Sequence, residues 1–314
     1  MHIYRWDLDR TYLDTEIDSV RGLLRTAFES ASRKKNIPGS ATLLRALTTH
    51  DSRARVHILS GSPTQMRHVL EQKLALDGIR VDSLTLKDNL GHLRHGRLRA
   101  VKDQLGYKLP HLLRQRVGLG NAVKETLFGD DTEVDPLVYV VYSDAIAGRL
   151  DEATLTRILE AKAAYPRAID ESLRALEQIG TSDAVEDIFI HIDRGVPIGD
   201  LRLLGQRITP VFSWFQAAVV LWTRGRIDIK GVVDVARTCT LESSLDQYGL
   251  AGLFQDMYRR RLATEKQVET LLADEAFNPV QTATIALLSQ LGEPPTPTIV
   301  AVPDYFAFLR VIHH

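Results

Sequence analysis

The chain has almost no cysteine, almost no net charge and no hydrophobic run long enough for a membrane. Its 314 residues include one cysteine, Cys239, which excludes an intramolecular disulfide and leaves a cysteine-based metal site without ligands. The net charge of −1 argues against a dedicated nucleic-acid binder, which normally has a strong basic excess. The most apolar stretch, residues 208–223, is shorter than the roughly twenty residues of a membrane span. It contains Pro210, Ser213 and Gln216, and we expect it to form a buried core helix.

The remaining composition is that of an ordinary globular protein. Hydrophobic residues make up 44% of the chain, and the mean hydropathy is −0.11. A length of 314 residues is enough for two domains. Acidic residues at positions 7, 9 and 14 leave no apolar core for a signal peptide. We therefore expect a cytoplasmic protein with no nucleic-acid partner and no integral membrane association.

Three short polar motifs each follow a run of residues typical of a buried strand. They are DLDRT at residues 7–11, SGSP at residues 60–63 and GDDTEVD at residues 129–135. In an open parallel sheet the C-terminal ends of the strands converge on one crevice, where ligands bind. Carboxylates crowded into such a crevice are costly to bury unless a cation joins them. A small number of hard oxygen ligands suits Mg²⁺, which is the cofactor we expect.

The order of these motifs resembles the haloacid dehalogenase (HAD) superfamily of phosphohydrolases, which carries DxDxT, a strand-terminal serine, a lysine and GDxxxxD. The spelling is most similar to the actin-patch type of phosphatidate phosphatase and its bacterial relatives, with SxSP and GDxxxxDPxxY. This chain has SGSP at residues 60–63 and GDDTEVDPLVY at residues 129–139. The resemblance covers residues 1 to about 195. It implies an α/β fold with a HAD-like Rossmannoid parallel sheet and phosphatase activity.

The resemblance also implies the catalytic roles. Asp7 would be the nucleophile that attacks phosphorus and forms an aspartyl-phosphate. Asp9 would protonate the leaving oxygen and then deprotonate the attacking water. Thr11 would close the turn and steady its geometry through its hydroxyl. Ser60 and the amide of Gly61 would donate hydrogen bonds to a phosphate oxygen.

The metal ligands follow from the same resemblance. Mg²⁺ would be held by the carboxylate of Asp7, the main-chain carbonyl of Asp9 and the carboxylate of Asp130. Asp135 would be a further or water-mediated ligand. Asp131 competes with Asp130 for this role, but the Gly-Asp step and the spacing to Asp135 favour Asp130.

A lysine of the third motif completes the implied site, and three candidates are open: Lys102, Lys108 and Lys124. Relatives place this lysine at the start of a helix, about twenty residues before the Gly-Asp step. Lys108 fits best because Pro110, a residue common near helix starts, follows closely. Lys124 would lie at the wrong end of the strand that precedes the third polar motif.

Along the chain we expect two domains, a phosphatase domain at residues 1–199 and an all-α domain at residues 200–314. A helical insertion is expected at about 12–50 and a helical connection at about 151–180. The β-branched run at residues 186–193 predicts a fifth strand that completes the sheet.

The motifs predict a Mg²⁺-dependent phosphomonoester hydrolase that works through an aspartyl-phosphate on Asp7, with a phosphorylated small molecule or lipid as substrate. One alternative is a lipid-phosphate phosphatase, acting on phosphatidate-like molecules. Another is a docking or regulatory protein whose helical C-terminal domain is the working module.

Overall fold

The computed structural model describes residues 1–15, 30–88, 103–132, 134–193, 195–291 and 302–312. Contacts divide the chain into two units. The sheet unit comprises Met1–Lys35, Arg53–Pro210 and Val300–His314, and the helical unit comprises Asn36–Ser52 and Val211–Ile299. The domain boundary at residue 199 stays a prediction. The contacts, however, place residues 36–52 with the C-terminal helices and residues 300–314 with the sheet.

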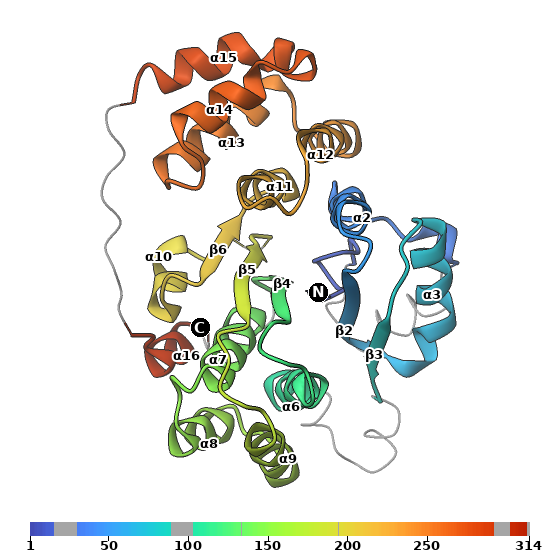
Figure 1. Cartoon of the computed structure of the whole chain (residues 1–314), viewed down its shortest axis with the longest axis vertical. Coiled ribbons are helices and arrows are strands. Elements are labelled where there is room, and N and C mark those ends of the chain that lie inside the picture. Colours follow the sequence, from blue (N-terminus) through green and yellow to red (C-terminus); the bar gives the residue numbers. More distant parts are fainter. Residues whose placement is uncertain (16–29, 89–102, 133, 194, 292–301, 313–314) are drawn as a thin grey trace. The chain divides into compact units, whose positions relative to one another are not determined.

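A parallel sheet forms the centre of the sheet unit, as the sequence predicted, but it has six strands rather than the expected five (Figure 1). Its strands are β1 (His2–Trp6), β2 (Arg55–Pro63), β3 (Ser83–Lys87), β4 (Lys124–Asp130), β5 (Val185–His191) and β6 (Ile208–Val211), in the order β3-β2-β1-β4-β5-β6. The predicted fifth strand is confirmed, because β5 pairs in parallel with β4. The motif-bearing strands β1, β2 and β4 are therefore neighbours in the middle of the sheet.

The sixth strand corrects one prediction. Residues 208–223 were expected to form a single buried helix, but Ile208–Val211 is strand β6 and only Trp214–Thr223 forms helix α11. Pro210 has no backbone N–H and is tolerated in an edge strand but not in a helix interior. Ser213 then starts the helix, because its backbone is extended and its side chain accepts a hydrogen bond from the amide of Phe215.

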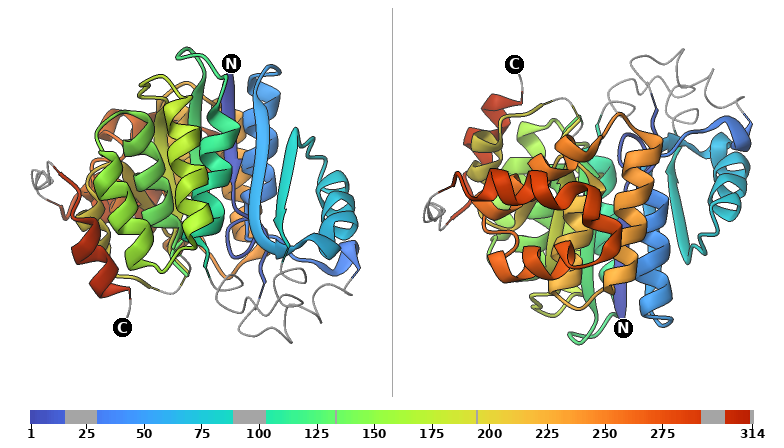
Figure 2. Two further views of the ribbon diagram at one scale, coloured as in Figure 1. Left: turned by 90° about the horizontal axis from the view of Figure 1, so that it is seen from below. Right: turned by 90° about the horizontal axis from the view of Figure 1, so that it is seen from above.

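Helices of the sheet unit fill the connections between strands. They are α3 (Arg67–Leu76), α6 (Leu105–Arg116), α7 (Asp135–Ile146), α8 (Glu152–Ala161), α9 (Pro166–Glu177), α10 (Ile198–Leu201) and α16 (Tyr305–Val311), with 3-10 turns η1 (Ala31–Arg33), η2 (Thr64–Met66) and η3 (Arg202–Leu204). Helices α8 and α9 confirm the predicted helical connection. Helix α6 packs against α7 and α9, and Figure 2 shows α6 to α9 as one layer of helices. All twelve residues of α7 are buried, so this helix anchors the layer on the sheet.

The chain returns to the sheet unit at its C-terminal helix, α16. Phe308 and Leu309 join the hydrophobic core that α6 and α7 share. The hydroxyl of Tyr305 donates a 2.6 Å hydrogen bond to Oδ2 of Asp144 in α7. These contacts dock α16 on the core of the sheet unit.

The helical unit contains α2 (Ser40–His50), α11, α12 (Ile229–Glu242), α13 (Gln247–Arg259), α14 (Glu265–Leu272), 3-10 turn η4 (Glu275–Phe277) and α15 (Asn278–Leu288). Its core includes the rings of Phe215, Phe254 and Phe277, which contact one another. Helix α2, part of the predicted insertion at 12–50, packs against α12. Residues 16–29 of that insertion lie outside the described residues. The C-terminal region is helical as predicted, but it is not all-α, because Ile208–Val211 forms strand β6 of the sheet.

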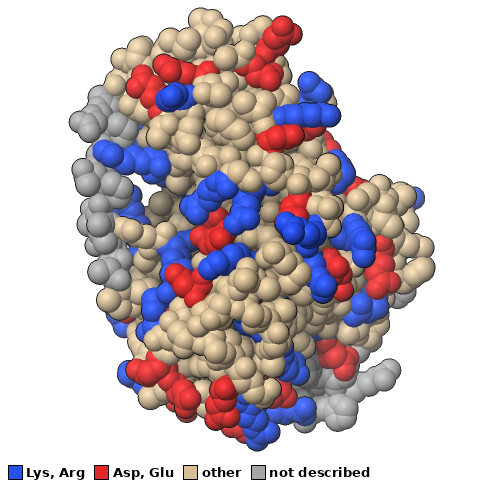
Figure 3. Space-filling view, in the orientation of Figure 1, with Lys and Arg blue, Asp and Glu red and all other residues tan. Residues whose placement is uncertain are grey.

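Figure 3 shows basic and acidic residues interspersed on the face in view.

Candidate active site

An aromatic ladder across three strands positions the first and third polar motifs. Trp6 and Phe128 are paired residues of β1 and β4, and their rings stack with centroids 4.1 Å apart. Phe128 and Phe189, paired in β4 and β5, continue the stack at 5.4 Å. Immediately beyond the ladder, the amide of Asp7 donates a 2.9 Å hydrogen bond to the carbonyl of Phe128. The register of the central strands thus fixes where Asp7 leaves the sheet.

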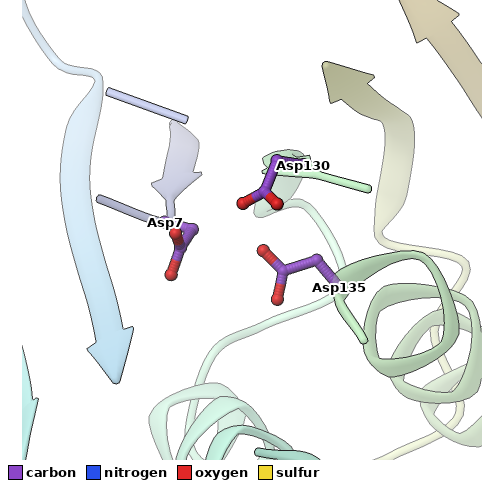
Figure 4. A group of neighbouring side chains, drawn as sticks. All are labelled: Asp7, Asp130 and Asp135. Carbon is purple, nitrogen blue, oxygen red and sulfur yellow. The ribbon is translucent and has the colours of Figure 1, made fainter. Parts of the chain in front are cut away.

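Asp7, Asp130 and Asp135 form a buried carboxylate cluster (Figure 4). Asp7 follows β1, Asp130 ends β4 and Asp135 is the first residue of α7. One oxygen from each lies within 4.8 Å of the others, and none of the three residues is more than 1% exposed. Oδ2 of Asp135 has no hydrogen-bond partner among the described residues. Three buried carboxylates this close repel one another and so favour a cation between them.

Gly129 allows Asp135 to approach the end of β4. A Cβ atom at this position would lie 2.6 Å from Oδ2 of Asp135 and 2.7 Å from the ring of Tyr139. Burial, together with the charge of Asp135, raises the pKa of Tyr139 well above its usual value. Its phenol therefore stays protonated and donates a 3.1 Å hydrogen bond to the carbonyl of Phe128. Gly129, Asp135 and Tyr139 of the GDxxxxDPxxY motif thus pack against one another. The same motif supplies Asp130 and Asp135 to the carboxylate cluster.

Lys108 is the lysine that the structure brings to the cluster. Its Nζ lies 2.8 Å from Oδ1 of Asp7 and 2.5 Å from Oδ1 of Asp135, and the side chain is fully buried. Lys124 is the first residue of β4, and its Nζ donates to the carbonyl of Asp183. Lys102 lies outside the described residues. Of the two candidates that can be placed, only Lys108 contacts the carboxylates.

Helix α6 begins earlier than the sequence indicated. Pro110 was expected near the helix start, but the helix begins at Leu105 and Pro110 lies inside it. Oδ1 of Asp103 accepts a 2.7 Å hydrogen bond from the amide of Gly106, which satisfies one of the first helical donors. Lys108 is the fourth residue of this helix, so it lies at the helix start as the resemblance implied.

Asp9 lies within a group of hydroxyls. Its Oδ2 accepts hydrogen bonds from Ser62 at 2.7 Å and from Ser60 at 3.0 Å, and its Oδ1 accepts one from Thr15 at 3.1 Å. The side chain of Asp9 does not belong to the cluster of Asp7, Asp130 and Asp135 found among the described residues. The carboxylate expected to act as acid and base is therefore held apart from the carboxylates expected to bind metal.

The second polar motif lies in an extended strand. The motif was expected to form a turn after its strand, but β2 runs through to Pro63 with an irregularity between Ser60 and Pro63. The Ser60 hydroxyl, expected to donate to phosphate, donates to Asp9 here and accepts from the amide of Ser62. A Cβ at Gly61 would lie 2.6 Å from the terminal amide of Gln104, so a side chain at this position would require that amide to move.

Hydroxyls also hold Asp130. Thr11 donates a 3.1 Å hydrogen bond to Oδ2, and the amide of Thr132 donates one of 2.7 Å to Oδ1. Thr11 therefore links the first polar motif to the third. The neighbouring Asp131 accepts from the amides of Asp193 and Val196 instead. The carboxylate in the cluster is that of Asp130, as the sequence favoured over Asp131.

Sequence reasoning missed Ser62 and Thr15 as partners of Asp9, and Thr132 as a partner of Asp130. The signal for Ser62 was present in the SGSP motif, because residues two apart in a strand face the same side. Thr15 gave no comparable signal, since a loop returns it to Asp9.

Residues 6–155 match the family model for the catalytic domain of the phosphatidate phosphatase APP1. This segment is a HAD-type phosphatase domain. The match spans just under half of the chain. No curated protein and no solved structure matches the chain.

The matched segment contains Asp7, Asp130 and Asp135 of the carboxylate cluster, together with Asp9 and Lys108. Its family makes it a phosphoric monoester hydrolase, and the buried carboxylate cluster is compatible with a metal-dependent site. Among the described residues, no helix combines the length and apolar character needed to cross a membrane.

Proposed function

We propose that this protein hydrolyses the phosphate monoester of a phosphatidate-like lipid, with Mg²⁺ as cofactor and Asp7 as nucleophile. The observation that carries the proposal is the buried cluster of Asp7, Asp130 and Asp135 with Lys108 against it. The family match supports a lipid phosphate over other monoesters, because phosphatidate is the substrate in the family's description.

The donor set fits Mg²⁺. Asp7, Asp130 and Asp135 offer hard carboxylate oxygens, which this ion prefers. The buried Oδ2 of Asp135 has no hydrogen-bond partner among the described residues and could serve as a ligand. When bound, Mg²⁺ would offset the charge between Asp7 and the phosphate.

The chemistry proposed for the side chains has two steps. A carboxylate oxygen of Asp7 attacks phosphorus, the bond from phosphorus to the lipid oxygen breaks, and Asp9 gives its proton to that oxygen. Asp9 then takes a proton from a water molecule, whose oxygen attacks phosphorus and releases phosphate from Asp7. Lys108 holds Asp7 in position and balances part of the negative charge around it.

A docking or regulatory role for the whole protein is less favoured. Asp7, Asp9, Ser60, Lys108 and Asp130 are all present, and the structure groups them around one end of the sheet. A core that served only for docking would not need to keep this arrangement. The cytoplasmic location stays a prediction.

The test is phosphate release from phosphatidate, an aryl phosphate, sugar phosphates and nucleotides, each with Mg²⁺ or with excess EDTA. We expect Mg²⁺-dependent release, fastest from phosphatidate, and none from the Asp7→Asn variant, because an amide is a poor nucleophile and a poor metal ligand. Full activity in that variant or in EDTA would refute the mechanism. Faster hydrolysis of sugar phosphates or nucleotides would refute the lipid substrate alone.

A further inference from the structure

A cavity of about 560 Å³ lies on the outer face of helix α6, between this helix and the start of α9. Its wall on α6 consists of residues at helical spacing: Gly106, Tyr107, Pro110, His111 and Arg114. The volume is within the range of pockets that bind small molecules. The cavity lies entirely within the sheet unit.

Tyr107 contacts both the cavity and the second polar motif. Its ring lines the cavity, while its hydroxyl donates a 3.1 Å hydrogen bond to the carbonyl of Ser60 in the second polar motif. The next residue, Lys108, contacts Asp7 and Asp135. Consecutive residues of α6 thus contribute to the cavity and to the catalytic cluster.

The cavity also reaches the end of the sheet where the catalytic carboxylates lie. Lys87, the last residue of β3, lines it. The Lys87 ammonium donates a 2.7 Å hydrogen bond to the carbonyl of Asp103 and lies 5.2 Å from the ring centre of Tyr107. These contacts fix the wall nearest to the active site.

Apolar surfaces provide much of the lining. They come from the rings of Tyr107, Pro110, Tyr165 and Pro166 and the methyl group of Ala168. An apolar group can pack against these surfaces and be removed from water there.

The charged groups of the lining are already paired. Glu171 lies 2.8 Å from Arg167 and 3.8 Å from Arg114, while Lys87 has the contacts described above. Three basic and two acidic side chains line the cavity, which gives a net charge of +1. Burial and the charge of Arg114 lower the pKa of His111 to about 4, so His111 is neutral near pH 7. This lining does not form a second phosphate site, yet its net charge is compatible with an anionic lipid.

On the basis of the proposed function, we propose that this cavity binds the glycerol-ester and first acyl segments of the lipid whose phosphate is attacked by Asp7. The cavity would therefore set the preference of the enzyme for the apolar part of its substrate, while the carboxylate cluster acts on the phosphate alone.

The test compares dibutyryl and dihexanoyl phosphatidate, which are short enough to be assayed as monomers, with an aryl phosphate. Wild-type enzyme should show a higher kcat/KM for dihexanoyl phosphatidate, by roughly tenfold if two of the added methylenes are buried. Ala168→Trp fills the cavity and should reduce this ratio to near one. Activity on the aryl phosphate should change less than about twofold, because that substrate does not use the cavity. Ala153→Trp, at an exposed position of α8, is the matched control and should keep the wild-type ratio.

A ratio of two rate constants does not depend on how much of the variant is folded, and Ala168→Leu provides a milder substitution. An unchanged chain-length ratio in both Ala168 variants would overturn the proposal while leaving the lipid-phosphatase function intact. An equal loss on all three substrates would also overturn it, because the cavity would then act through the catalytic residues. If wild-type enzyme hydrolysed the aryl phosphate but neither lipid, the proposed function would fail and this inference with it.

Discussion

The hydroxyl of Ser62 lies 2.7 Å from Oδ2 of Asp9, closer than the hydroxyl of Ser60, which donates to the same oxygen at 3.0 Å. Thr15 holds the other oxygen of the carboxylate. Asp9 is therefore oriented by hydroxyl donors from β2 and from the loop after β1. The hydrogen bond of Ser62 joins it to Asp9 and not to the carboxylate cluster. Ser62 is therefore a residue that positions Asp9.

Ser62→Ala should lower kcat by roughly 10- to 100-fold with little change in KM, because a hydrogen bond to a charged group contributes about 1.5–3 kcal/mol. Steady-state kinetics on an aryl phosphate measures both constants. Ser62→Thr retains the hydroxyl and should recover much of the lost rate. A rise in KM at constant kcat would instead mean that Ser62 contacts the substrate.

Lys108→Met keeps most of the side-chain volume but removes the charge beside Asp7 and Asp135. We expect kcat/KM to fall by roughly 10²–10³, the effect of losing one preorganised electrostatic contact. The variant should also gain more thermal stability from added Mg²⁺ than the wild type does, since its carboxylates have no other cation nearby. Lys124→Met, at the start of β4, is the control and should keep wild-type activity. Equal kinetics for the two variants would remove Lys108 from the site.

Asp130→Asn and Asp131→Asn should have different effects, because Asp130 belongs to the carboxylate cluster and Asp131 holds a loop. Asp130→Asn should raise the Mg²⁺ concentration for half-maximal activity by roughly tenfold or more, since it removes a charged ligand. Asp131→Asn should leave that concentration unchanged and lower the melting temperature, because Asp131 accepts hydrogen bonds from the amides of Asp193 and Val196. Mg²⁺ titrations of both variants measure the difference. If only Asp131→Asn raised the Mg²⁺ concentration for half-maximal activity, Asp131 would be the metal ligand and Asp130 the residue that supports the loop.

Stability should depend on pH through His57. Burial and the charge of Arg5 lower the pKa of His57 to about 4, against the raising effects of Asp82 and Glu125. Between pH 6.5 and 4 the unfolded chain binds a proton at this position and the folded chain does not, so stability falls as pH falls through this window. His57→Gln should reduce the drop in melting temperature between pH 7 and pH 4.5. His68→Gln, an exposed position of α3, should not. An identical drop in melting temperature in His57→Gln and wild type would show that His57 does not cause the pH dependence.

The sequence predicted the carboxylate cluster because position relative to strands determines it. Asp7 and Asp130 follow the strand-like runs that became β1 and β4, and parallel neighbours end at the same edge. The spacing from Gly129 to Asp135 was equally informative, since it leaves room for a turn into α7. Strand positions thus predicted that these motifs converge, whereas the roles of the individual carboxylates came from the resemblance to the HAD superfamily.

Other features depended on contacts that spacing does not encode. Thr15 reaches Asp9 only through the path of a loop. The start of α6 was placed too late because Pro110 is a general helix-start signal, whereas this helix begins at Leu105 with Asp103 bonded to the amide of Gly106. Pro210 indicated a break, but the apolar residues around it fit a strand and a helix equally well.

Helix α16 has a consequence for biosynthesis. Its side chains join the core around α7, although residues 211–299 of the helical unit are made between β6 and this helix. During translation, the core of the phosphatase domain therefore stays incomplete while about ninety further residues are synthesised. A chaperone could bind the partly formed domain during this interval. A premature stop anywhere before Tyr305 would leave the hydroxyl partner of Asp144 unmade, even though every catalytic residue had already been incorporated.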